Sequence, residues 1–141
     1  MQPFHFRLER VRRIREHLED RAQRDWSQAR DHAQLQHQAL QRLESERSDA
    51  AAFGYGQMDL ELRTAMYQYI SVLDRRIAQQ RTVVSEADAR EETARQRWIE
   101  ARQDRESLDK LKEKQYEEHS AERLRQEQNL LDDAAKNAQS L

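Results

Sequence analysis

Apolar residues recur at alternating steps of three and four along the second half of the chain. From Met66 to Leu108 two interleaved series keep this alternation over six heptads. One series is Ile70, Ile77, Val84, Glu91, Trp98 and Arg105, and the other is Met66, Leu73, Gln80, Ala87, Ala94, Ala101 and Leu108. This repeat predicts a helix whose narrow apolar seam packs against another helix in a left-handed coiled coil.

The apolar positions of the first half also follow helical spacing, although less regularly. They are Phe4, Leu8, Val11, Ile14, Leu18, Ala22, Trp26, Ala29, Ala33, Leu40 and Leu43. Successive steps of four, from Leu18 to Trp26, depart from a strict heptad. We interpret them as a stutter that locally unwinds the supercoil. Trp26 and Trp98 both fall on the predicted seams, and core packing is their simplest role.

Both glycines of the chain lie between these two helical stretches, in the segment AAFGYGQ at 51–57. Glycine adopts positive φ without a steric penalty, so it ends a helix and lets the chain turn. We therefore expect Gly54 and Gly56 to form the tip of a helical hairpin. A phosphate-binding glycine loop would need a preceding strand and a following Lys or Ser/Thr, and neither is present.

The pattern as a whole predicts an all-α fold, a long antiparallel two-helix coiled coil in a single domain over 1–141. We expect helix 1 at about 3–52, the turn at 53–57, and helix 2 at about 58–138 with a bend near its start. With the turn at 54–56, residue 5 faces residue 105 and the last 35 residues overhang. Either this overhang binds a partner, or a broad corner in QMDLELRTAMYQ shifts the pairing so that the termini meet.

Composition favours a helical chain over a disordered one. Charged residues make up 37% and hydrophobic residues 36% of the chain, the mean hydropathy is -1.22, and there is one proline. A disordered segment would be rich in Pro, Gly and Ser, whereas this chain is rich in good helix formers. The absence of cysteine excludes disulfides and thiolate metal sites. No apolar run approaches the ~20 residues that span a bilayer, so we expect a soluble cytoplasmic chain.

Charge is distributed unevenly along the chain. Residues 1–15 carry five arginines against Glu9, a balance of +4, whereas 113–141 carry seven acids and four bases, a balance of -3. Opposite charge favours the two ends lying side by side, and so favours the shifted pairing. The basic stretch lacks an aromatic platform, which argues for an acidic protein surface rather than nucleic acid as its partner.

The sequence contains no arrangement of residues that is typical of a metal site or a catalytic site. None of the five histidines lies at i,i+4 to another metal ligand on a buried face, and adjacent acidic residues diverge on a helix. A two-helix coil offers no pocket in which a nucleophile, base and orienting group could meet. We therefore expect a non-enzymatic protein with no cofactor and no metal site.

Three stretches, in order along nearly the whole chain, carry a resemblance to a known family. They are FHFRLERVRRIRE at 4–16, YQYISVLDRRIAQQ at 67–80, and LDKLKEKQYEEHSAERLRQEQNLLDDAA at 108–135. Together with the Gly-x-Gly turn, they resemble the FliJ family of the bacterial flagellar type III export apparatus. Each motif is degenerate, as coiled-coil motifs are, and it is their order and spacing that carry the resemblance.

The resemblance implies a stalk-like antiparallel coiled coil, similar to the central stalk subunit of rotary ATP synthases. Such proteins bind the hexameric export ATPase, the cytoplasmic domain of the membrane export gate, and export chaperones. They promote assembly and activity of the ATPase and couple it to export without hydrolysing ATP themselves. The expected location is the cytoplasm, peripheral to the inner face of the cell membrane at the flagellar base.

The family's contact residues carry over onto two regions of this chain. The stretch that meets the export gate matches Tyr69, Leu73, Arg76 and Gln80, although Leu73 and Gln80 also fit the seam. Some members carry tyrosines before the loop where Gln41 and Ser45 stand here, which puts half of that patch in doubt. The helix ends that would meet the ATPase match Phe4, Phe6, Leu8, Arg10, Val11, Arg12, Arg13, Leu124, Glu127, Leu131 and Asp132.

Two other classes of protein share this pattern. One is the stalk of a virulence injectisome, whose patterning would be nearly the same. The other is a structural coiled coil that self-associates, but such a protein usually has an uninterrupted heptad and no glycine tip.

Overall fold

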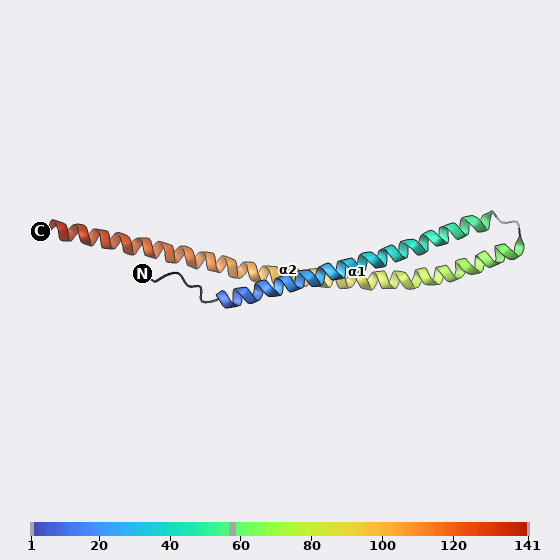
Figure 1. Cartoon of the computed structure of the whole chain (residues 1–141), viewed down its shortest axis with the longest axis horizontal. Helices are drawn as coiled ribbons and strands as arrows, with labels where there is room; N and C mark the ends of the chain where they lie inside the picture. Colours follow the sequence, from blue (N-terminus) through green and yellow to red (C-terminus); the bar gives the residue numbers. More distant parts are fainter. Residues whose placement is uncertain (1, 57–58, 141) are drawn as a thin grey trace. The chain divides into compact units, whose positions relative to one another are not determined.

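A computed structural model describes residues 2–56 and 59–140. These residues form two long helices, α1 (Glu9–Tyr55) and α2 (Leu60–Gln139), shown in Figure 1. No strand occurs in either described stretch. The predicted all-α antiparallel helical hairpin is therefore confirmed. The chain divides into two compact units, unit 1 (Met1–Asp20 and Ile99–Leu141) and unit 2 (Arg21–Trp98); the expectation of one domain stays a prediction.

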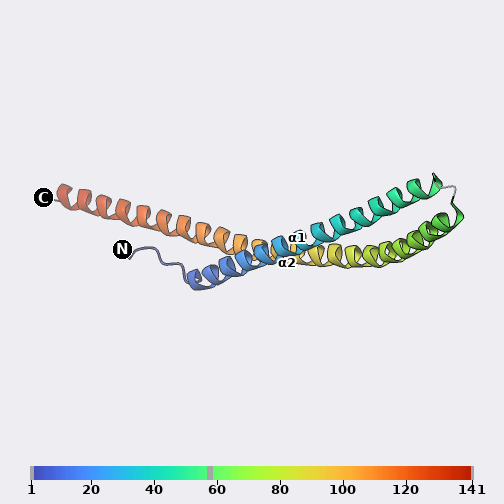
Figure 2. The same cartoon turned by 45° about the vertical axis from the view of Figure 1, so that its right-hand side comes forward.

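In unit 2 the two helices run antiparallel, side by side in both views (Figures 1 and 2). The predicted seam of α2 is confirmed, because Leu73, Ile77, Val84 and Ala87 are buried. The remaining seam residues of this unit are half-buried, while almost every residue between them is exposed. This narrow seam is the hydrophobic core of the unit, and it needs only the few apolar residues that the chain has.

The seam of α1 keeps a strict 3-4 alternation, so the predicted stutter is wrong. Its positions are Leu8, Arg12, Arg15, Glu19, Ala22, Trp26, Ala29, Ala33, Gln36, Leu40, Leu43, Arg47, Ala50 and Gly54, each of which is buried, half-buried or ion-paired with α2. The apolar pattern missed it because the seam is charged at Arg12, Arg15 and Glu19. Leu18, from which the stutter was inferred, is 43% exposed and off the seam.

Two tryptophans pack together in the seam of unit 2, at the end farthest from the turn. The rings of Trp26 and Trp98 stack with their centroids 5.1 Å apart and their planes 25° from parallel. The Arg30 guanidinium carbon lies 5.4 Å from the centroid of the Trp26 ring, within cation–π range. Both tryptophans have the packing role that the sequence predicts.

The turn differs from its prediction. Helix α1 continues through Gly54, which is buried within it, and no described glycine has positive φ. A Cβ at Gly54 would lie 3.6 Å from the Met66 Cβ, an ordinary contact, so the small side chain is not sterically required there. Gly56 is in the turn, whereas the predicted turn residue Gln57 lies outside the described residues.

Helix α2 begins at Leu60 because Asp59 caps it. The backbone N–H of Glu61 donates to the Asp59 carboxylate at 3.0 Å, which satisfies one of the free donors of the first turn. The cap, rather than positive φ at glycine, is the turn chemistry visible in the described residues. It places the start of α2 two residues beyond the predicted one.

Helix α1 begins at Glu9 rather than near residue 3, because the preceding residues pack on α2 in unit 1. The Phe4 ring meets the edge of Tyr116 with centroids 5.3 Å apart, and the Phe6 side chain is buried. His119 Nε2 lies 3.1 Å from the carbonyl oxygen of Gln2. Residue 2 therefore lies beside residue 119, well before the end of α2 at Gln139. The pairing falls between the two alternatives, because the overhang is shorter than 35 residues but the two ends do not meet, and the fully exposed part of α2 is 123–140.

Candidate partner-binding surfaces

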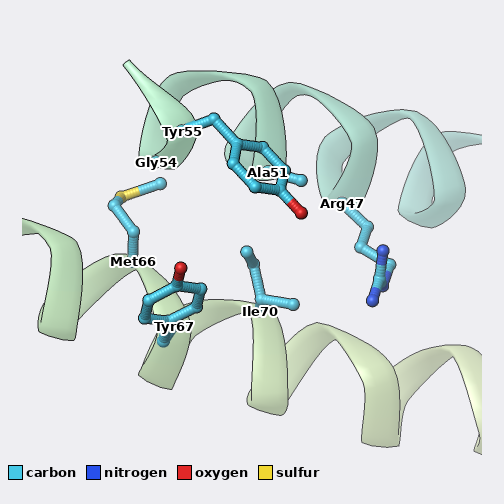
Figure 3. A pocket seen from close by; sticks show the side chains of 7 residues that line it. All are labelled: Arg47, Ala51, Gly54, Tyr55, Met66, Tyr67 and Ile70. Carbon is cyan, nitrogen blue, oxygen red and sulfur yellow. The ribbon is translucent and has the colours of Figure 1, made fainter. Parts of the chain in front are cut away.

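A small cavity lies between the helices near the connection in unit 2 (Figure 3). It measures about 180 Å³ and is lined by Arg47, Ala51, Gly54, Tyr55, Met66, Tyr67 and Ile70. The small residues of α1 leave the space, and the two tyrosines flank it. Arg47 is ion-paired with Asp74, so its charge is already balanced within the unit.

Several large apolar side chains near the connection are exposed on the surface of unit 2, and two of them, Tyr55 and Tyr67, line the cavity. The exposed ones are Phe53, Tyr55, Leu60, Leu62, Tyr67 and Tyr69. Tyr55 is 84% exposed, the most exposed of them. Exposed apolar residues on an otherwise polar surface are candidates for a protein contact. Tyr67 and Tyr69 are two positions apart and so point to different sides of α2. We call these six residues the tip cluster.

In unit 1 the helices are joined by a charged seam rather than an apolar one. Arg105 makes two hydrogen bonds to the Glu19 carboxylate, at 2.6 and 3.1 Å. Glu9 lies 2.9 Å from the Lys112 ammonium and 2.9 Å from the Arg12 guanidinium. Asp109 contacts both Arg12, at 3.4 Å, and Arg105, at 2.9 Å. Acidic and basic groups thus alternate across the two helices.

The charged seam shifts the pKa values of its members. Hydrogen bonds from Arg12 and Lys112 lower the pKa of Glu9 to about 2. The hydrogen bond from Arg105 likewise lowers the pKa of Glu19. Hydrogen bonds to Glu19 and Asp109 raise the pKa of Arg105 further above its ordinary value. The charged forms are therefore the ones that hold this part of the helix pair together.

Two apolar surfaces of unit 1 are left uncovered. One consists of Val11, Ile14 and Leu18 on α1, which are 41%, 51% and 43% exposed. We call these three residues the outer stripe. The other is the end of α2 at 123–140, where every described residue is exposed and where Leu124, Leu130 and Leu131 stand among charged residues of both signs. We call this segment the free end.

Comparison with protein families decides the identity. The family model described as "Flagellar FliJ protein" matches residues 4–140. The chain belongs to the FliJ family. The search of curated proteins and the search of solved structures find no match. Membership makes this a flagellar export-associated protein, and it belongs to a structural and coupling family rather than a family of enzymes.

Membership also suggests a location at the flagellar base. Neither helix of the described residues is long and apolar enough to cross a membrane. The described residues hold no group of three or more His, Asp or Glu side chains that could bind a metal ion.

The residues that match the FliJ family's gate contact lie in different environments on α2. Tyr69 is 43% exposed and Arg76 is exposed, so both can meet a partner. Leu73 is fully buried, and the Gln80 amide donates to the backbone and side-chain oxygens of Gln36 at 3.0 and 2.9 Å. Leu73 and Gln80 therefore serve packing, and the gate contact itself stays a prediction.

The residues that match the FliJ family's ATPase contact also fall into two groups. Phe4, Phe6, Leu8 and Arg12 pack on α2 or belong to the charged seam. The exposed ones are Arg10, Val11, Arg13, Leu124, Glu127, Leu131 and Asp132. All lie in unit 1, and their role in binding stays a prediction.

Sequence reasoning missed two features of this FliJ-family chain, the tip cluster and the separate face of the outer stripe. Each outer-stripe residue stands one position before a charged seam residue: Val11 before Arg12, Ile14 before Arg15, and Leu18 before Glu19. Opposite charges on α2, at Asp104, Arg105 and Asp109, could have revealed the true seam, but only once the register was known.

Proposed function

We propose that this protein is a stalk-like coupling component of flagellar protein export. It binds the export ATPase hexamer through unit 1, promotes assembly and turnover of the ATPase, and contacts the export gate through α2 in unit 2. It also handles export chaperones, hydrolyses no ATP itself, and acts at the inner face of the membrane. The observation that carries the proposal is the uncovered apolar and charged surface of unit 1.

The ATPase contact is supported by the exposure of the free end. Every described residue of 123–140 is exposed, and Leu124 and Leu131 are each 66% exposed. The N-terminal segment reaches only the start of this stretch, where Gln2 and Pro3 line a hollow with Arg123, Gln126, Glu127 and Leu130. Exposed apolar side chains cost free energy in water, so a helix keeps them where a partner covers them. The flanking charges make the contact part hydrophobic and part electrostatic.

The gate contact is supported by the exposure of Tyr69. Its side chain is 43% exposed, and a large aromatic side chain with a polar end is a frequent hot spot in protein interfaces. Arg76, also exposed, adds a basic group two turns further along α2.

Export ATPase turnover tests the proposal. We expect the wild-type chain to stimulate assembly and turnover of the purified ATPase. Leu124→Asp with Leu131→Asp should abolish this stimulation, because the charges oppose burial of the free end. The helix content measured by circular dichroism should stay the same, because neither side chain packs within the chain.

The matched control is Leu35→Asp, which changes a leucine that is 62% exposed on α1 in unit 2. This variant should stimulate the ATPase like the wild type. Full stimulation by the double variant would remove the free end from the contact, and no stimulation by the wild-type chain would refute the stalk function.

A further inference from the structure

The helix pair of unit 1 is joined mainly by ion pairs near its surface. Four of them cross from α1 to α2: Glu9–Lys112 at 2.9 Å, Arg12–Asp109 at 3.4 Å, Arg15–Asp104 at 3.3 Å and Glu19–Arg105 at 2.6 Å. Of these eight side chains, only that of Glu19 is less than a fifth exposed, at 14%. Partly exposed ion pairs add little stability and are screened by salt. The contact that joins the two helices here is therefore weak and depends on ionic strength.

Unit 2 has an apolar core, whereas unit 1 has almost none. The buried hydrophobic residues of unit 2 are Ala33, Ala50, Leu73, Ile77, Val84 and Ala87. Among the described residues of unit 1, Phe6 alone is buried. Hydrophobic burial supplies most of the stability of packed helices. Separation of the two helices therefore costs less free energy in unit 1 than in unit 2, so unit 1 can open locally while unit 2 stays paired.

The N-terminal segment 2–8, which precedes α1, is held on α2 by two phenylalanines. We call this segment the strap. Phe6 is 4% exposed, and the Phe4 ring centroid lies 5.3 Å from that of Tyr116 and 5.6 Å from that of His119. Before Phe4, the strap borders an open hollow of about 420 Å³ beside α2. Two aromatic side chains are a small contact, so the strap can leave α2 together with the start of α1.

We propose that the strap and the start of α1, residues 2–20, form a latch that separates from α2 and closes again while unit 2 stays paired. In the closed form Phe4 and Phe6 pack on α2 and are withheld from other proteins. Opening frees both side chains, together with the surface of α2 near Tyr116 that they cover. Because ion pairs hold the latch closed, a partner that offers competing charges shifts it toward the open form.

The latch makes the proposed ATPase contact conditional on opening. Phe4, Phe6 and Leu8 match the FliJ family's ATPase contact, yet each is buried or half-buried in the closed form. If the proposed function holds, the ATPase engages these residues only in the open form, and the closed latch is autoinhibitory. This consequence rests on the proposed function, whereas the opening does not and is measured on the chain alone.

Distances between spin labels test the opening. The chain has no cysteine, so labels can be attached at exposed positions, at Ile14→Cys with Ser107→Cys in unit 1 and at Ser45→Cys with Arg75→Cys in unit 2. Between about 0.05 and about 0.5 M salt, screening weakens exposed ion pairs. The unit 1 distances should therefore shift to longer values, while the unit 2 distances stay the same. Unchanged unit 1 distances over this range would overturn the proposal.

Variants of the central ion pair identify what holds the latch closed. Arg105→Gln removes the pair with Glu19 and should lengthen the unit 1 distances even at low salt. Arg81→Gln is the matched control, because it removes the cross-helix pair with Glu44 in unit 2 and should leave the unit 1 distances unchanged. Wild-type distances in Arg105→Gln would show that the ion pairs do not hold unit 1 closed, and would overturn the latch.

An apolar seam should lock the latch. Glu19→Leu with Arg105→Leu places two leucines opposite each other on the seam, where they can replace a partly buried ion pair without loss of stability. The unit 1 distances of this variant should stay short at every salt concentration. A shift with salt as large as that of the wild type would contradict the role of the charged seam.

Stimulation of the purified export ATPase tests the autoinhibition separately. The leucine variant should stimulate less than the wild type because its latch stays closed, and Arg105→Gln should stimulate at a lower chain concentration. Wild-type stimulation by the closed leucine variant would overturn the autoinhibition. No stimulation by the wild-type chain would refute the proposed function and the autoinhibition with it, whereas the label distances decide the opening without the ATPase.

Discussion

At the residue scale, two residues that are four positions apart on the same helix have different environments. Leu73 has no exposed area, whereas Tyr69, one turn earlier on α2, is 43% exposed. The heptad pattern predicted the burial of Leu73 correctly, because a 3-4 repeat fixes which residues of a helix meet its partner. The same pattern places Tyr69 beside the seam residue Ile70 rather than on the seam, in agreement with its partial exposure.

Alanine substitutions distinguish the two roles. Leu73→Ala should lower the free energy of unfolding by about 2–5 kcal/mol, because it leaves a cavity in the seam. Tyr69→Ala should leave the melting temperature nearly unchanged and weaken binding to the cytoplasmic domain of the export gate. Thermal unfolding followed by circular dichroism, and a titration with that domain, measure the two effects.

Val83→Ala is the control, because Val83 is 38% exposed on α2 and outside the tip cluster. It should change neither the melting temperature nor the gate affinity by much. Wild-type gate affinity in Tyr69→Ala would leave the tyrosine without a binding role.

At the element scale, two stretches of α1 are held to α2 by different interactions. Around Trp26 and Ala33 the helix packs by apolar and aromatic contact, whereas Arg12, Arg15 and Glu19 bind α2 through ion pairs. Hydrophobic periodicity predicted the first region and placed the second on the wrong face. A charged residue is expected to be exposed unless its ion-pair partner on the other helix is known. The sequence of α1 alone could therefore not reveal this part of the seam.

The charged seam should respond to acid. The pKa of Glu9 is about 2 in the folded chain, below the ~4.3 of an unfolded glutamate. A depressed pKa contributes stability that is fully present above the unfolded value and is lost as pH falls toward 2. The melting temperature should therefore fall between about pH 4.3 and pH 2.

Glu9→Gln should show a smaller fall over that range and a lower melting temperature at pH 7, because the charge is absent throughout. Glu46→Gln, an exposed site in unit 2, should follow the wild-type profile. Identical profiles for Glu9→Gln and the wild type would show that Glu9 does not hold the helices together.

At the scale of the whole molecule, the sequence predicted two antiparallel helices but not their register. The two glycines led us to expect the turn at 54–56. In the structure α1 continues to Tyr55, and α2 begins after the Asp59 cap. The unequal charge of the two ends indicated the direction of the shift, but residue 2 lies beside residue 119 and the two ends do not meet. The free end is consequently half as long as the simplest hairpin would leave it, 18 residues in place of 35.

Backbone amides should exchange hydrogen more slowly where the two helices pack together than where one helix is exposed. Backbone amides near Leu73 and Ala87 should exchange most slowly, because opening there exposes the buried seam. Amides of 123–140 should exchange fastest within the helices, since no second helix stabilises them. Mass spectrometry after timed exchange measures this order, and added export ATPase should slow exchange in 123–140 first. Uniform exchange along α2 would contradict both the seam and the free end.

The stacked tryptophans give the molecule an optical property of its own. Trp26 and Trp98 are the only two tryptophans of the chain, and their rings touch across the two helices of unit 2. Tryptophan fluorescence, excited selectively, therefore reports one place alone, the contact between α1 and α2 beside Ala22 and Ala94. Any event that parts or rotates the helices there changes the emission without an attached dye. Opening of the pair can thus be followed in real time in the unmodified protein.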